Sequence, residues 1–161
     1  DGKEPSLEGL TRHRSEVELR VPALLPDDYI PDINNRLSLY KRIASSDTEQ
    51  QLEEIQVELI DRFGLLPDAA KNLIRQTSLR NHAERLGIRK IDMGNQGGVI
   101  EFTDNTKVKP EVIIGLMQTA PKHYKLDGPN RLRITQPLED TQSRLKLVES
   151  LLSDFSQEQT E

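Results

Sequence analysis

Four charged residues on one predicted helix are the side chains of this sequence best suited to bind a partner. They recur at i, i+4, i+7 and i+8, which places them on one helix face: Glu54, Glu58, Asp61 and Arg62. Acidic side chains at this spacing repel one another by roughly a few tenths of a kcal/mol per pair. A partner that presents arginines would relieve the repulsion and form charge-assisted, bidentate hydrogen bonds. The alternative interpretation is a plain solvated face.

Patterns typical of catalytic or cofactor sites are missing from the sequence. It has no cysteine, and therefore no zinc–thiolate site or thiol nucleophile, and it contains no P-loop, dinucleotide or nucleophile-elbow motif. No two of its histidines are at metal-ligand spacing, so His82 is expected to be solvated or to cap a helix. The adjacent Asp27 and Asp28 point apart in an extended chain, which favours a loop role over Mg²⁺ binding. We therefore expect no catalytic, metal or cofactor site in this chain.

Two further features invite a phosphate or nucleic-acid interpretation. Residues 94–98 are Gly-Asn-Gln-Gly-Gly, but they lie between two predicted strands, which favours a hairpin turn over a phosphate loop. Residues 71–133 hold 12 basic and 6 acidic groups, within a net charge of −5 for the whole chain. A DNA-binding patch in this basic half is the alternative to a solvated face, although Phe102 is the only aromatic residue between positions 64 and 123 for base stacking.

The hydrophobic pattern predicts one domain of mixed helix and strand. Leu, Ile, Val and Phe account for 44 of the 161 residues, which is enough to form a core. Period-two segments predict five strands, at 16–21, 88–93, 99–103, 123–126 and 132–135. Helical periodicity predicts five helices, at 32–44, 48–63, 67–86, 110–117 and 138–155. The order β-ααα-ββ-α-ββ-α indicates an α/β (mixed α+β) fold, with a roughly five-stranded mixed sheet and about five packed helices. The helix after Pro110 is apolar most of the way round, so we expect it to be buried.

The ends of the chain have a different composition from its centre. Residues 1–15 are polar and lack periodicity, which predicts a linker or tail, and residues 156–161 predict a second polar tail around a single domain at 16–155. No apolar run approaches the length of a membrane span, so a cytoplasmic protein is the default expectation. Because residue 1 is Asp and not Met, we expect a piece of a longer protein.

Two unusual motifs resemble a known family. The first is Ala-x-x-Pro-x-x-Tyr-Ile followed by Arg-Leu and Tyr-Lys-Arg, at Ala23, Pro26, Tyr29, Ile30, Arg36, Leu37, Tyr40, Lys41 and Arg42. The second is Glu-Leu-x-Asp-Arg-Phe-Gly-x-x-Pro, at Glu58, Leu59, Asp61, Arg62, Phe63, Gly64 and Pro67. Both resemble the C-terminal domain of bacterial transcription-repair coupling factors (the Mfd family), over residues 16–135.

The resemblance implies a function that spacing alone does not. Proteins of this family are DNA translocases that displace stalled RNA polymerase and recruit excision repair through UvrA. Their motor, which uses ATP and Mg²⁺, lies upstream, so the resemblance implies no cofactor and no catalysis in this domain.

The resemblance also implies a role for residues 16–155, as a C-terminal regulatory domain. That domain packs on the UvrB-like N-terminal module of the same protein, masks UvrA binding and restrains the motor until RNA polymerase is engaged. Glu54, Glu58, Asp61 and Arg62 are then the expected contacts, in a domain that is monomeric by itself and not bound to membranes. A nucleic-acid-binding accessory module that uses residues 71–133 is the alternative.

Overall fold

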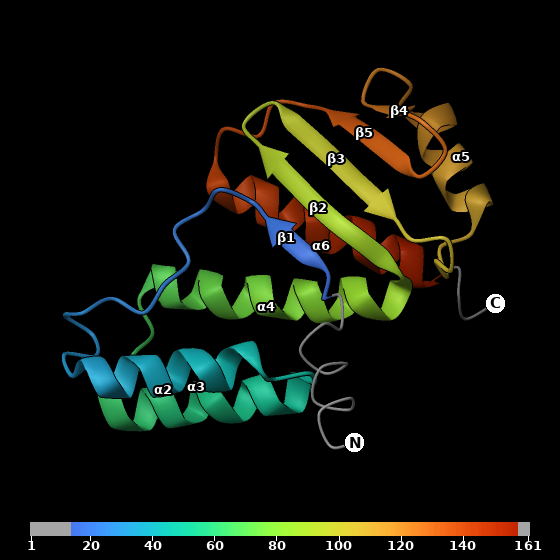
Figure 1. Ribbon diagram of the computed structural model, residues 1–161. Coiled ribbons are helices and arrows are strands. Elements are labelled where there is room, and N and C mark those ends of the chain that lie inside the picture. The colour runs from blue at the N-terminus through green and yellow to red at the C-terminus, as the bar shows by residue number, and fades with distance from the viewer. Residues whose placement is uncertain (1–13, 158–161) are drawn as a thin grey trace, which may run out of the picture.

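The computed structural model describes residues 14–157, which form five strands and five helices (Figure 1). In chain order these are β1 (Glu16–Glu18), α2 (Ile33–Ala44), α3 (Glu49–Phe63), α4 (Asp68–Leu86), β2 (Ile88–Gly94), β3 (Gly97–Phe102), α5 (Pro110–Thr119), β4 (Tyr124–Leu126), β5 (Arg131–Thr135) and α6 (Thr141–Gln157). The predicted fold class and element order are confirmed. The predicted tails at 1–15 and 156–161 stay a prediction, because residues 1–13 and 158–161 lie outside the described part.

The sheet is mixed and has the strand order β1-β2-β3-β5-β4. β1 runs parallel to β2, and the other neighbours are antiparallel. Figure 1 shows α4 and α6 against one face of the sheet and leaves the opposite face open. No described helix is long and apolar enough to cross a membrane.

The buried residues form two separate hydrophobic clusters. The sheet lobe, made of β1–β5, α5, α6 and the C-terminal half of α4, encloses residues such as Ile91, Ile100 and Phe155. The helical lobe, made of α2, α3 and the N-terminal half of α4, encloses residues such as Leu39 and Leu59. α4 is therefore the element that both cores share, and α2 and α3 project from it as an antiparallel pair (Figure 1).

Local signals in the sequence set the helix ends of the helical lobe. The carboxylate of Asp32 accepts a hydrogen bond from Asn35 N and caps α2. Thr48 and Gln51 form a capping box at the start of α3, and α3 ends at Gly64. α4 ends at Gly87, whose φ of 73° is left-handed and favours glycine. These caps set where α2 and α3 begin and where α3 and α4 end.

Two expectations from the sequence are wrong. The first strand ends at Glu18 and not at residue 21, because Arg20 adopts a φ of 53° that turns the chain out of the sheet. α5 is not buried: none of its residues is fully enclosed, and Ile114 remains 45% exposed. Apolar composition predicted burial, but α5 packs at the outer edge of the sheet beside β4 (Figure 1), where its side chains that contact the core are only partly buried.

The turn after β1 is held by a buried arginine of α6. Arg144 is only 7% exposed, and its guanidinium donates to the carbonyl oxygens of Leu19 at 3.0 Å, Arg20 at 2.9 Å and Leu138 at 2.8 Å. These carbonyls come from the segments that follow β1 and β5. The side chain of Arg144 therefore provides hydrogen-bond donors to backbone carbonyl oxygens of both segments, which have no neighbouring strand to pair with.

We expect Arg144→Gln to lower the free energy of unfolding by about 3 kcal/mol, because it leaves several buried carbonyls without donors. Urea titration followed by far-UV circular dichroism measures the change. Lys146→Gln, on the exposed side of the same helix, is the control and should unfold like the unsubstituted chain. Equal midpoints for the two variants would contradict the role of Arg144.

Candidate partner-binding face

Packing of α3 directs its charged residues outward. Leu52, Ile55 and Leu59 are buried in the helical lobe, so the opposite side of the helix faces solvent. The four residues singled out from the sequence lie on that side, where three are exposed and Glu58 is partly covered. Their geometry is that of one helix face, as the spacing predicted, while their function stays a prediction.

Glu58 is the centre of a charge cluster. Arg42 of α2 binds it with two hydrogen bonds of 2.8 and 2.9 Å, and Arg62 adds a third of 2.8 Å. The Arg62 guanidinium also lies over the ring of Phe63, 4.8 Å from its centroid. Hydrogen bonds from Arg42, and then from Arg62, lower the pKa of Glu58 to about 2. Glu58 is therefore held as a carboxylate and fixed between two helices.

Sequence reasoning missed Arg42. It lies 16 residues before Glu58 on a different helix, so no helical spacing connects the two. The only available signal was its place in the Tyr-Lys-Arg motif. The repulsion expected along α3 is partly relieved inside the domain, and a partner arginine would have to compete with Arg42 for Glu58.

Glu54 and Asp61 provide the free acidic groups of this face. Neither forms an ion pair with any residue between 14 and 157, and Glu54 only accepts a 3.4 Å hydrogen bond from Gln50. Val57 lies between them along the helix and is 56% exposed. We call Glu54, Val57, Glu58, Asp61 and Arg62 the α3 face. It combines two unpaired carboxylates, one preformed ion-pair cluster and a small apolar centre.

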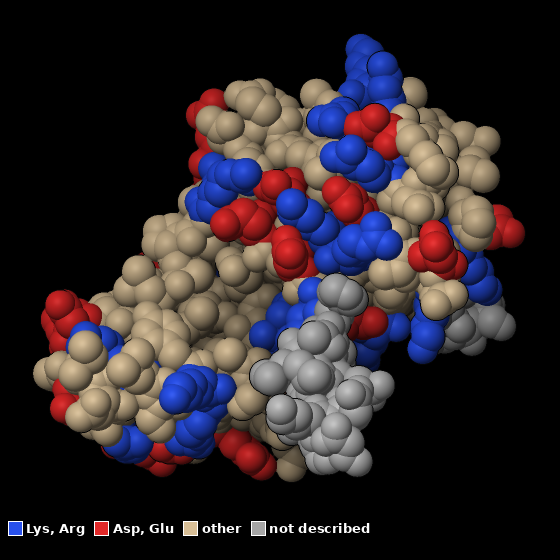
Figure 2. All heavy atoms as spheres, in the orientation of Figure 1, with Lys and Arg blue, Asp and Glu red and all other residues tan. Residues whose placement is uncertain are grey.

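The basic half of the sequence folds into a surface of mixed charge. Figure 2 shows Lys and Arg interspersed with Asp and Glu over the open side of the sheet. Three arginines there are paired with carboxylates of neighbouring positions: Arg20 with Asp92, Arg131 with Glu101 and Arg133 with Asp127. Each of these three positive charges on the open sheet face is therefore already paired with a carboxylate.

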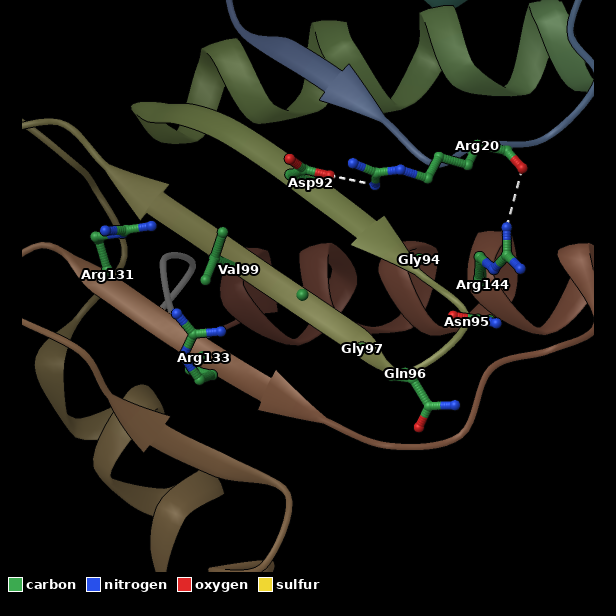
Figure 3. Close-up of a pocket in the computed structure, with 11 residues that line it drawn as sticks. Arg20, Asp92, Gly94, Asn95, Gln96, Gly97, Val99, Arg131, Arg133 and Arg144 are labelled. Carbon is green, nitrogen blue, oxygen red and sulfur yellow. Dashed lines mark hydrogen bonds and ion pairs between the residues drawn. The ribbon is translucent and has the colours of Figure 1, made fainter.

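A shallow hollow of about 660 Å³ lies on this open sheet face (Figure 3). The hairpin between β2 and β3 forms one wall, which confirms a turn at residues 94–98. A Cβ on Gly97 or Gly98 would lie about 2 Å from a backbone oxygen of Ile134 or Asp92. These glycines permit close backbone approach, and nothing in their geometry requires a phosphate.

The other candidate side chains do not assemble into a catalytic site. His82 is half-buried between α4 and α6, where its Nε2 contacts Ser156 Oγ, so the expectation that it is solvated or a cap is wrong. Burial lowers the pKa of His82. Within residues 14–157 no three His, Asp or Glu side chains are grouped closely enough to hold a metal ion.

Comparison with known proteins identifies the family. The model of the TRCF domain matches residues 19–113. Transcription-repair-coupling factor from Escherichia coli is 54% identical over 97% of this chain, and that from Haemophilus influenzae is 52% identical over 94%. A solved structure of the C-terminal domain of transcription-repair coupling factor has the same fold, with a TM-score of 0.70 and 24% identity over 89% of this chain and 95% of that one.

The chain is thus an α/β domain from a class of DNA-repair proteins. It belongs to the transcription-repair-coupling factor family. It spans about 14% of the length of the Escherichia coli relative and 13% of that from Haemophilus influenzae. The activities of such full-length proteins therefore do not follow from this domain alone.

The Glu58 cluster predicts a measurable pH dependence. Its folded-state pKa of about 2 lies below the ordinary value of 4.5, so the cluster stabilises the domain above about pH 4.5 and loses this effect as the pH falls toward 2. Arg42→Gln should raise the pKa of Glu58 toward 4.5, as followed by NMR of its carboxyl carbon. Lys41→Gln removes a neighbouring positive charge and is the control. A pKa that is the same in both variants would contradict the assignment to Arg42.

Proposed function

We propose that this chain is a non-catalytic regulatory domain of a longer transcription-repair coupling factor. In that protein it packs through the α3 face on the UvrB-like N-terminal module. The contact masks the surface that binds UvrA and restrains an ATP-dependent DNA translocase until RNA polymerase is engaged. The motor, with its ATP and Mg²⁺, belongs to parts of the protein outside this chain.

The observation that carries the proposal is the composition of the α3 face. Asp61 and Glu54 are exposed carboxylates without an ion pair among the described residues, and they flank Val57. They stand on a helix whose position is fixed by its capping box and by the buried side of the helical lobe. A basic partner surface would gain charge-assisted hydrogen bonds there without rearrangement of the domain.

The polarity of the face fits a contact that must open. Interdomain contacts dominated by charge release at modest cost, because water and neighbouring groups solvate the separated charges. Arg42 and Arg62 would hold Glu58 after separation, as they do in this structure. The open state would therefore not leave the Glu58 carboxylate unpaired.

A nucleic-acid-binding accessory module remains the second candidate, and the paired arginines of the open sheet face count against it. A phosphate backbone would have to displace carboxylates from Arg131 and Arg133 before it gained their charge. DNA affinity of this domain measured against salt concentration separates the candidates. Several phosphate contacts would give a steep salt dependence, whereas a protein-binding domain should show little binding.

Charge reversal at Asp61 provides the sharpest test of the proposed contact. In the full-length protein, Asp61→Lys should weaken docking by about tenfold or more if the pair is central, since each tenfold corresponds to about 1.4 kcal/mol. The variant should bind UvrA more tightly and hydrolyse ATP faster without polymerase. Asp61 is preferable to Glu58, because reversal at Glu58 would also break the cluster with Arg42 and Arg62.

Glu111→Lys is the matched control, because it reverses an exposed carboxylate on α5, far from the α3 face. It should leave UvrA affinity and basal ATPase unchanged. Asp61→Lys could behave like this control while deletion of the domain still raised UvrA affinity and basal ATPase. The contact would then lie elsewhere on the domain. If deletion also had no effect, the regulatory role would be wrong.

The proposal also predicts that the chain neither binds nor hydrolyses ATP. Isothermal titration with Mg²⁺–ATP should give no saturable heat, and a phosphate-release assay should give no turnover, because no element within residues 14–157 is arranged to cradle phosphates. Turnover that follows the purified domain through successive columns would contradict this prediction.

A further inference from the structure

α5 is the most apolar helix of the protein, yet it contributes no fully buried residue to either core. Half of its ten residues are large and apolar: Val112, Ile113, Ile114, Leu116 and Met117. A helix of this composition normally has its apolar surface covered. In this domain α5 lies at the outer edge of the sheet beside β4 (Figure 1), where Val112, Ile113, Leu116 and Met117 pack partly buried against the sheet lobe and Ile114 remains exposed.

The exposed apolar surface of α5 continues into a groove of about 320 Å³. Side chains from three parts of the chain line it: Phe102 at the end of β3, Ile113 and Ile114 on α5, and Leu126 on β4, together with Val108 and Pro129. Ile114 is 45% and Leu126 53% exposed, so two exposed large hydrophobic residues meet here from different elements. Thr103, Thr106 and Asn130 add polar groups to the lining, and a concavity of this size accepts one or two large side chains.

One charged residue, Asp104, lines the groove itself, whereas lysines are frequent in the segments around it. The structure describes eight lysines, and half of them lie in the two segments that flank α5: Lys107, Lys109, Lys122 and Lys125. All four are exposed, and none forms an ion pair with residues 14–157. The residues on either side of Lys107 and of Lys109 in the sequence line the groove. The unpaired carboxylates nearby are Asp104 and Glu111, so the lysines outnumber them by two.

We infer that this groove, which we call the α5 groove, binds an acidic amphipathic segment of another polypeptide. One or two large apolar side chains of that segment fill the space between Ile114 and Leu126, and its carboxylates lie toward Lys107 and Lys109. Helix-in-groove recognition combines apolar anchors and flanking charges in this way. The α5 groove belongs to the sheet lobe and the α3 face to the helical lobe, at opposite ends of the molecule in Figure 1, so both can be occupied at once.

Methyl NMR on the whole chain tests this inference. The probe is a short amphipathic peptide with leucine and phenylalanine on one face and glutamate on the other. It should shift the methyl signals of Ile113, Ile114 and Leu126 and leave those of Leu37 and Val57 in place. A peptide with the same apolar residues and lysine in place of glutamate should bind about tenfold or more weakly, because the charges then repel.

Variants separate the apolar and charged contributions. Ile114→Asp should abolish binding of the acidic peptide, and its partial exposure makes the substitution compatible with folding. Leu37→Asp is the matched control, since Leu37 is 53% exposed on α2, and it should bind like the unsubstituted chain. Lys107→Glu combined with Lys109→Glu should weaken the acidic peptide and strengthen the basic one. The backbone NMR spectrum verifies that each variant is folded.

Three outcomes would overturn the inference. Equal affinity for the acidic and basic peptides would show that the groove does not select charge. Unchanged binding by the folded Ile114→Asp variant, or shifts confined to the helical lobe, would place the contact elsewhere. Concentration-dependent shifts of the α5 groove signals without peptide would show that a second copy of the chain covers it. None of these results depends on the α3 face or its proposed partner.

Discussion

The packing of α4 against two different cores is the constraint on which the rest of the structure depends. Ala70 and Ile74, near its start, pack in the helical lobe, whereas Leu79, Ala83 and Leu86, near its end, pack in the sheet lobe. One helix therefore has to be apolar toward different neighbours along its length. This requirement explains why its hydrophobic stripe looks diffuse in the sequence although the helix has many buried residues. It also sets the position of the α2–α3 pair relative to the sheet.

The two lobes are joined by polar contacts as well as by α4. Asn81 of α4 is buried and donates to the carbonyl oxygen of Ser46 at 2.9 Å, in the turn between α2 and α3. Arg14 binds both Asp47 at 2.8 Å and Glu84 at 2.9 Å, which links the same turn to α4. Buried and partly buried polar contacts of this kind have strict geometry. They hold the α2–α3 pair in one orientation, so the α3 face presents its charges to a partner from a rigid support.

The sequence predicted well the features that depend on residues close together in the chain, and poorly those that depend on contacts between distant residues. The capping box at Thr48 and Gln51 and the stop at Gly87 are local, and the helix ends they predict are those observed. β1 ends early at the positive φ of Arg20, and Arg144, more than a hundred residues away, binds the carbonyls of Leu19 and Arg20 there. No periodicity of residues 16–21 contains that information. The α3 face followed from helical spacing, but its internal partner Arg42 required the packing of two helices.

The contrast between α3 and α5 shows how composition alone misjudges a surface. α3 exposes carboxylates that spacing revealed, and part of their charge is already neutralised by Arg42 on the neighbouring helix. α5 was expected in the core because of its apolar residues, yet none of them is fully buried and Ile114 stays open to solvent. An apolar surface left open lowers the solubility of the isolated domain and has no benefit for its folding. A partner that covers it would remove this cost, while the paired charges of the open sheet face need no partner because their neighbours already satisfy them.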